Sequence, residues 1–147
     1  MRKILSAAFI GATAYAMALA ASAQAATTYT VVVVPATQRT NTGVAYSAGQ
    51  TVTVTATGTA AWGSDGVGKK DLFSGPAGNI HSTIPTYIDP SCPFMSLIGQ
   101  IGSNGPYHCL GAKASFVADG DGDLLLVAND GNLTDNAGAY EALIAAP

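Results

Sequence analysis

Residues 50–57 constrain the fold of this chain more than any other stretch. They read "QTVTVTAT" and alternate without a break, with Val52, Val54 and Ala56 on one side of an extended chain and threonines on the other. Period-two alternation with a polar outer face is typical of a half-buried antiparallel strand. We therefore expect a sheet with one face against a core and one face in water.

Other runs rich in Val, Ile, Leu and aromatic residues are separated by turn signals, and no amphipathic helical stretch lies outside the N-terminal segment. In the last run, Tyr140, Ala142 and Ile144 are expected to point inward. The pattern predicts an all-β fold, an antiparallel β-sandwich of jelly-roll type. Region 63–91 is rich in Gly, Pro and Ser, so it is either a functional loop or a missed element. The predicted strands are 29–34, 50–57 (which 58–62 continues or follows), 95–101, 113–118, 123–129 and 139–144.

Residues 1–25 have the pattern of a secretory signal peptide. Arg2 and Lys3 precede a long apolar stretch, which ends in the small-residue sequence Ala23-Gln24-Ala25. A membrane anchor is the competing interpretation, because the stretch approaches spanning length. The Ala-x-Ala ending favours cleavage, which leaves residues 26–147, one domain of 122 residues (147 − 25). We expect a secreted or periplasmic protein without a membrane anchor.

The charge of the chain argues against nucleic acid as a partner. The net charge is −3, and removal of Arg2 and Lys3 with the signal peptide makes it −5. No basic patch is left to neutralise phosphates. Five of the nine acidic residues fall between Asp119 and Asp135, which is a reasonable place for a cation.

The only two cysteines are Cys92 and Cys109. In an oxidising compartment, an even number of cysteines favours a disulfide, worth about 3 kcal/mol for a loop of this length. Two free buried thiols are the alternative.

The connection "NDGNLTDNAGAY", residues 129–140, is unusually rich in side-chain oxygens. Asp130, Thr134, Asp135 and Asn136 lie within seven residues of a chain that has only 10% charged residues. Calcium takes six to eight oxygen ligands from carboxylates, amides, hydroxyls and carbonyls, so this loop is a candidate calcium site. The alternative is an ordinary polar turn, in which Asn and Asp satisfy nearby backbone groups.

The nearby "DGDGD", residues 119–123, does not form an EF-hand. That motif needs Gly at loop position six and Glu at position twelve, and the chain has Leu124 and Asp130 there. A hairpin turn, with Asp123 on the solvent face of the next strand, accounts for it better.

Three stretches together resemble a known family. They are "TVTVTATGTAAWG", "SLIGQIGSNGPYHCLGAKASFVADGDGD" and "LLLVANDGNLTDNAGAYEALI". They resemble the PA-I galactophilic lectins, calcium-dependent galactose-binding bacterial lectins, from about Gln50 to Ile144 with region 63–91 poorly matched. The resemblance implies a β-sandwich with one calcium ion (Ca2+), to which two neighbouring sugar hydroxyls bind. It also implies a homo-oligomer, because the family often forms multivalent assemblies.

Carried over by position, the resemblance implies a set of ligands. The calcium ligands would be the side chains of Asp130, Asp135 and Asn136, with the backbone oxygens of Trp62 and Thr134. The sugar, a galactoside or another glycan, would contact His81, Thr83, Asp130 and Asn136, with Tyr87 and Asp89 as weaker candidates. Asp135 stands where the best-known member has Asn, and the loop is one residue shorter. Trp62 either stacks on a ligand or belongs to the core.

Three functions follow from these features. The first is an exported calcium-dependent lectin. The second is an exported structural or adhesive domain in which calcium only stabilises a loop. The third, an enzyme, is disfavoured because the sequence has no Gly-x-Ser-x-Gly, HExxH or phosphate-loop motif. His81 or His108 as a base, or Asp119 with Asp123 as paired acids, would be its candidate groups.

Overall fold

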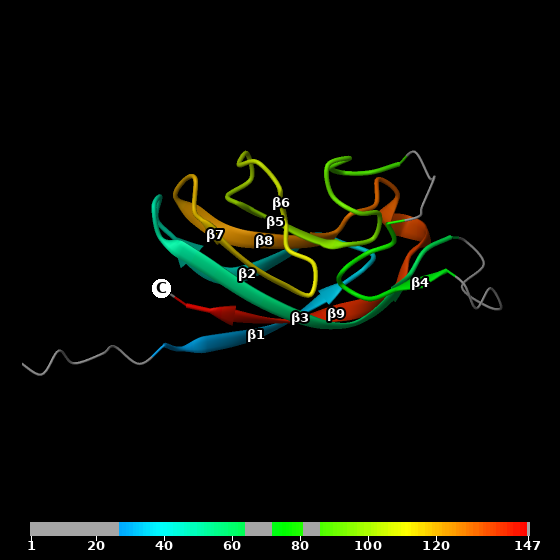
Figure 1. Cartoon of the computed structure of the whole chain (residues 1–147), viewed down its shortest axis with the longest axis horizontal. Coiled ribbons are helices and arrows are strands. Elements are labelled where there is room, and N and C mark those ends of the chain that lie inside the picture. Colours follow the sequence, from blue (N-terminus) through cyan, green and yellow to red (C-terminus); the bar gives the residue numbers. More distant parts are fainter. Residues whose placement is uncertain (1–26, 64–71, 81–85, 147) are drawn as a thin grey trace, which may run out of the picture.

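The computed structural model describes residues 27–63, 72–80 and 86–146. The described part of the chain forms two antiparallel sheets packed face to face, with a short 3-10 helix and no α-helix (Figure 1). The all-β sandwich predicted from the sequence is thereby confirmed. The predicted signal peptide lies outside the described residues. No helix within the described ranges is long and apolar enough to cross a membrane.

The first sheet is built around the longest described strand. This strand is β3 (Thr51–Ala61), which pairs with β9 (Ala137–Ala145) on one side and with β4 (Phe73–Ser74) and β7 (Lys113–Val117) on the other. β1 (Tyr29–Pro35) pairs with β9 and forms the edge of the sheet. The first and the last described strands are therefore neighbours, with Tyr29 opposite Ala145.

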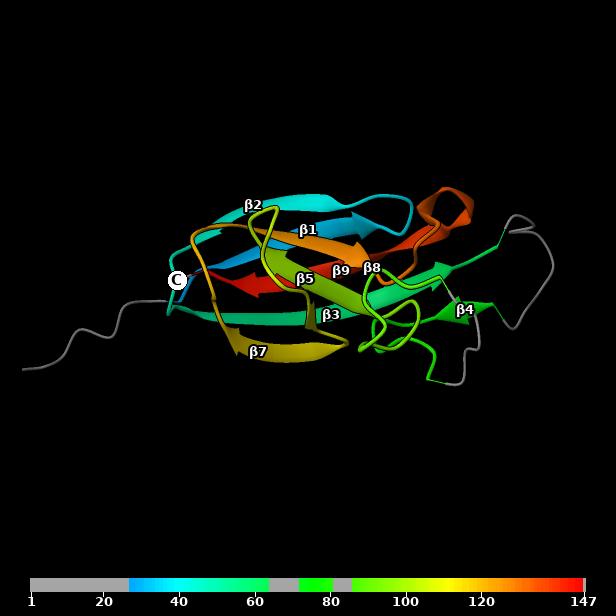
Figure 2. The same ribbon diagram turned by 90° about the horizontal axis from the view of Figure 1, so that it is seen from above.

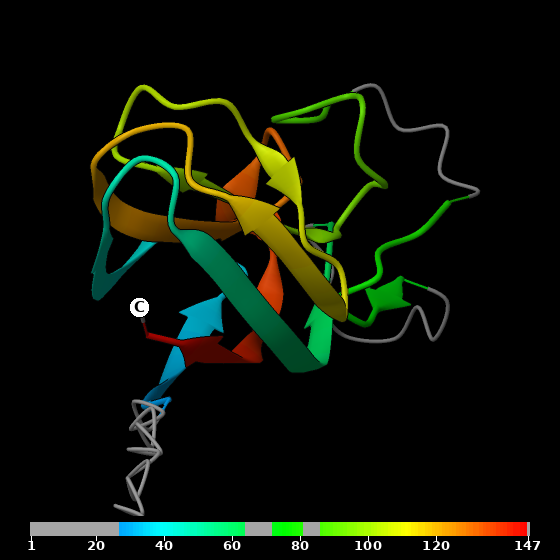
Figure 3. The same cartoon turned by 60° about the vertical axis from the view of Figure 1, so that its left-hand side comes forward.

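The second sheet has the order β2-β8-β5-β6. Its strands are β2 (Thr40–Tyr46), β8 (Gly122–Ala128), β5 (Leu97–Ile101) and β6 (His108–Cys109). β8 and β5 cover β9 and β3 (Figure 2). The β8–β9 connection therefore passes from one sheet to the other at one end of the sandwich, the end at which the described residues 72–80 and 86–95 also lie (Figures 1 and 3).

The core lies between the sheets and follows the alternation of the sequence. Val52, Val54 and Ala56 are buried on β3, and Tyr140, Ala142 and Ile144 are buried on β9 as predicted. β5 is buried on both faces, because Ile98 packs with Cys92 and Val127 in a second, smaller cluster outside the main core. This smaller cluster lies beneath the loop that carries the disulfide.

Most predicted strands are confirmed, and 58–62 continues its predecessor because β3 runs without interruption to Ala61. β5 begins at Leu97, two residues later than expected, since Met95 adopts a positive φ of 58°. β2 was not predicted. Its sequence "TNTGVAY" contains Gly43 with φ 70°, and its register with β8 shifts between Asn41 and Ala45, so it lacks a clean alternation.

A disulfide joins Cys92 to Cys109, as predicted. It ties the loop before β5 to β6, across the edge of the second sheet. Because it closes a segment of 17 residues, it stabilises the fold by about 3 kcal/mol in the chain-entropy model.

Candidate functional site

The oxygen-rich connection between β8 and β9 folds into a compact turn. Its centre is the 3-10 helix η1 (Leu133–Asp135), capped by the Asn132 side chain, whose Oδ1 accepts hydrogen bonds from the backbone N (3.4 Å) and Oγ1 (2.7 Å) of Thr134. Leu133 packs against the cluster around Cys92 and Ile98, so the turn is anchored to the outer side of the second sheet. The polar residues 130–136 therefore form a capped 3-10 turn, and they carry their side-chain oxygens on this turn.

Asp130 is a buried carboxylate at the start of this turn, and it is only 3% exposed. Its Oδ1 accepts a hydrogen bond from the backbone N of Asn132 (3.0 Å). Burial raises the pKa of the Asp130 carboxyl, and the neighbouring Asp135 carboxylate raises it further, whereas hydrogen bonds from Asn132, Asn136 and Thr86 lower it. A negative charge held in such a place is costly without a cation beside it.

Asp135 and Asn136 each bury an oxygen that has no hydrogen-bond donor. These atoms are Oδ1 of Asp135 and Oδ1 of Asn136. The amide of Asn136 is oriented by its Nδ2, which donates to the carbonyl oxygen of Ala36 (3.2 Å). A buried acceptor without a partner costs about 1–3 kcal/mol. Two such oxygens on adjacent residues, close in sequence to the buried Asp130 carboxylate, are the arrangement that a bound cation would stabilise.

Trp62 follows the last residue of β3 on the strand that pairs with β9. In that ladder Ala61 lies opposite Ala137, so the next residues outward, Trp62 and Asn136, face each other where the ladder ends. The indole is 8% exposed and packs edge-to-face on Phe94, with ring centroids 5.4 Å apart. The ring therefore belongs to the core rather than to a stacking platform. The Trp62 backbone, by contrast, lies beside the oxygen-rich turn.

The donor set fits a hard divalent cation such as calcium. Asp130 and Asp135 supply two negative charges, Asn136 supplies an amide oxygen, and the carbonyls of Trp62 and Thr134 are the proposed backbone donors. Among the described residues, no group of three or more His, Cys, Asp or Glu side chains is placed so that it could hold a metal ion. A site here would thus depend on amide and carbonyl oxygens in addition to its two carboxylates.

Asn129 is a key residue that sequence reasoning missed. It is fully buried, and its Oδ1 accepts from the backbone N of Ile88 (3.1 Å) and of Asp89 (2.9 Å). Its Nδ2 donates to three carbonyl oxygens, those of Asp89 (2.8 Å), Cys92 (3.0 Å) and Pro93 (3.1 Å). Its position directly before Asp130 could have indicated this role, but the alternation pattern placed Asn129 at the end of the predicted strand 123–129.

These bonds fix residues 86–94 against the oxygen-rich turn. The backbone N of Gly131 also donates to the carbonyl oxygen of Thr86 (3.1 Å). Between Asn79–Ile80 and Tyr87–Phe94 the surface forms a pocket of about 290 Å³. Tyr87 packs edge-to-face on Phe94, at 5.5 Å between centroids. The described part of region 63–91 thus places Tyr87 in the lining of this pocket, one residue after the Thr86 that bonds to the turn.

The predicted sugar contacts are only partly described. His81 and Thr83 lie outside the described residues. Of the weaker candidates, Tyr87 lines the pocket, and the Asp89 carboxylate accepts from the backbone N (2.8 Å) and Oγ (2.7 Å) of Ser91. Asp89 therefore acts within its own loop.

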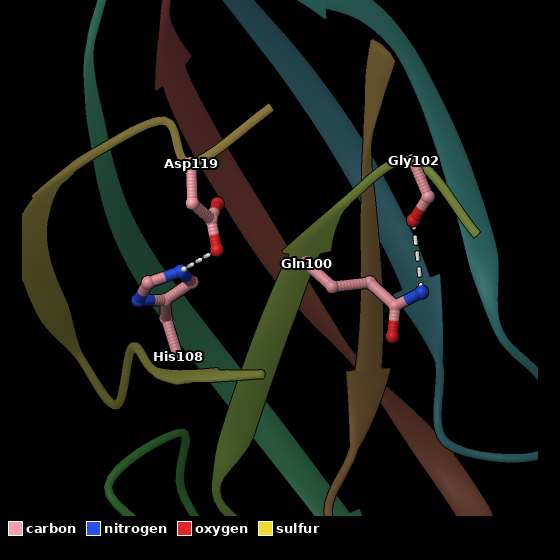
Figure 4. Close-up of polar contacts among 4 residues, drawn as sticks. All are labelled: Gln100, Gly102, His108 and Asp119. Atoms are coloured by element: carbon pink, nitrogen blue, oxygen red, sulfur yellow. Dashed lines mark hydrogen bonds and ion pairs between the residues drawn. The ribbon is translucent and has the colours of Figure 1, made fainter. Parts of the chain in front are cut away.

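Of the groups considered for catalysis, His81 lies outside the described residues, and His108, Asp119 and Asp123 lie near the other end of the sandwich. His108 stacks on Phe116, with centroids 3.9 Å apart, and its Nε2 lies 3.4 Å from Oδ2 of Asp119 (Figure 4). Gln100, on the neighbouring strand, donates from Nε2 to the carbonyl oxygen of Gly102 (2.8 Å). Asp123 accepts from Nδ2 of Asn41 (2.9 Å). Each of these side chains is engaged in holding a turn or a strand.

Comparison with known proteins adds a structural neighbour. No protein-family model matches the chain, and no curated protein does. A solved structure described as "EclA N-terminal domain; PllA-like lectin" superposes with a TM-score of 0.62 at 24% sequence identity, covering 81% of this chain and 96% of that one. At this identity the match shows a shared β-sandwich fold.

Proposed function

We propose that this protein is an exported, calcium-dependent carbohydrate-binding protein, a lectin in the general sense. The observation that carries the proposal is the pair of buried oxygens without a hydrogen-bond donor on Asp135 and Asn136. Both residues also interact with the buried Asp130 carboxylate, Asn136 through a hydrogen bond and Asp135 through its charge. The similarity of the fold to a protein described as a PllA-like lectin supports it.

The chain's own residues would first hold the ion. Asp130 and Asp135 neutralise its charge, and Asn136, aimed by its bond to Ala36, adds the amide oxygen. Bound calcium supplies a Lewis-acidic centre whose remaining coordination positions accept two neighbouring hydroxyls of a sugar. With a cation bound, the raised pKa of the Asp130 carboxyl would fall, because a neighbouring positive charge stabilises the ionised carboxylate.

Residues around the ion would determine which sugar fits. The loop 86–94 is held rigid by Asn129, by the disulfide and by the contact between Thr86 and Gly131. A rigid wall costs less ordering entropy on binding than a mobile one does. His81 and Thr83 remain the proposed polar contacts, and the resemblance suggests a galactose-type ligand. The disulfide supports export.

A glycan array tests the proposal. We expect the wild-type protein to bind a related group of glycans in calcium and none in a chelator. Asp130→Asn should abolish the signal, whereas Glu141→Gln, which removes a charge from an exposed position on β9, should leave it unchanged. Binding by Asp130→Asn at wild-type strength would refute the calcium-mediated mechanism. A calcium-stabilised protein without any glycan signal would favour the structural or adhesive domain.

A further inference from the structure

Three side chains on the outer face of β1 form an exposed apolar stripe. Tyr29, Val31 and Val33 are 62%, 60% and 58% exposed, and Leu143 on the neighbouring strand β9, opposite Val31, is 40% exposed. We call these four residues the β1 stripe. It lies on the outer face of the first sheet. β1 forms the margin of that sheet (Figure 1).

The stripe is confined to this margin. The outward positions of β3 are occupied by threonines at 51, 53, 55, 57 and 59. β1 itself reads "YTVVVVP", with Val34 fully buried and Val32 packed against the core. Continuous apolar runs of this kind are typical of strands that are buried on both faces. Within the described residues of one copy, only one face of this run is covered.

The same residues also have backbone groups that pair with no other strand of the described part of the chain. At the two ends of the β1–β9 ladder, Ala36 N donates to Gly138 O (3.0 Å) and Ala146 N donates to Thr28 O (2.9 Å). In an antiparallel ladder the direction of the backbone groups alternates with each residue. Even-numbered residues of β1 therefore bond to β9, and the N–H and C=O of Tyr29, Val31 and Val33 point to the free edge.

This edge carries none of the usual protection against strand pairing. Proteins blunt exposed edges with charges, interior prolines or bulges. β1 has no charged residue, its register with β9 is unbroken, and its one proline is its last residue. An edge that is apolar, regular and unpaired is a template for another strand.

We propose that the β1 stripe is the interface between two copies of this chain, which pair their β1 strands antiparallel about a two-fold axis at Val31. The register with Val31 opposite Val31 of the second copy also places Tyr29 opposite Val33. The first sheets of the two copies would then form one continuous sheet. Its central row of side chains would be Leu143 and Val31 of one copy followed by Val31 and Leu143 of the other, all apolar. The nearest acid, Glu141, is opposite Val33 and falls in a different row from its copy.

Charge and area both favour a second copy as the occupant. The net charge is −3 for the full chain and −5 without residues 1–25, so two copies associate most easily where neither presents an acid. The exposed parts of the four side chains amount to roughly 350–400 Å², about half of the ~800 Å² per partner of a standard interface. The paired backbones and flanking threonines contribute the remainder.

Sedimentation velocity of the purified, processed protein tests this proposal. We expect twice the monomer mass for the wild type and the monomer mass for Val31→Lys. The matched control is Val117→Lys, because Val117 is also 60% exposed but lies on β7, at the opposite side of the sheet. This control should remain a dimer.

A cysteine variant keeps the proposal testable if Val31→Lys does not fold. Residues in a hydrogen-bonded antiparallel pair have Cα atoms about 5.5 Å apart, within the range that a disulfide spans. Val31→Cys should therefore form a covalent dimer on mild oxidation, and Val117→Cys should not. A monomeric wild type, or a Val31→Cys variant that crosslinks no faster than Val117→Cys, would overturn the proposal.

Discussion

Asp130→Asn separates the two consequences of a buried carboxylate, its cost without a cation and its benefit with one. The substitution keeps the shape and an oxygen for the backbone N of Asn132, but it removes the charge. Because burial raises the pKa of Asp130, the ionised form destabilises the calcium-free fold, and that cost diminishes as the pH falls toward the raised pKa. In chelator at neutral pH, the variant should therefore be at least as stable as the wild type.

Calcium should reverse this order. At a free concentration one hundred times the dissociation constant, an ion that binds only the folded state adds about 2.7 kcal/mol. For a domain of this size that corresponds to a rise in Tm of roughly 8–15 °C. The wild type and Glu141→Gln should show the rise, and Asp130→Asn should show little of it. Thermal melts of the three proteins in calcium and in chelator measure both effects, and an equal rise in all three would refute the reasoning.

Three further predictions concern stability and can be checked by urea unfolding. Asn129→Ala should cost about 3–5 kcal/mol, since five backbone groups in buried or partly buried hydrogen bonds lose their partner, and should loosen the loop that follows residue 86. Reduction of the bond between Cys92 and Cys109 should cost about 2–4 kcal/mol under conditions that leave other groups unchanged. Gly138→Ala should cost about 2–4 kcal/mol, because φ is 81° and the added Cβ would lie 2.4 Å from the carbonyl oxygen of Thr59; a neutral result would mean that the strands can separate locally.

The sequence predicted the regular part of the fold because alternation and burial coincide there. In β3 and β9, every inward residue is apolar, so the core face can be identified without knowledge of the partner strand. β2 was not predicted because Gly43 and a shift in register interrupt its alternation. β4 and β6, two residues each, are held by their neighbours and leave no periodic signal.

The candidate site was only partly accessible from sequence. Asp130, Asp135 and Asn136 could be named because they crowd into one connection and match a family pattern. Asn129 could not, since its role depends on residues about 40 positions away that the fold brings back to it. The burial of Trp62 beside the turn likewise follows from the pairing of β3 with β9, which is a tertiary contact.

The central claim is that calcium in the turn of residues 130–136 holds the sugar, and linkage tests it most directly. If sugar hydroxyls bind the ion, saturating sugar must tighten calcium binding by the same factor by which calcium tightens sugar binding. Calcium titrations should be performed with and without a glycan identified on the array. We predict one calcium ion per chain and a lower dissociation constant in the presence of the sugar. An unchanged calcium affinity with a sugar that binds would contradict the account.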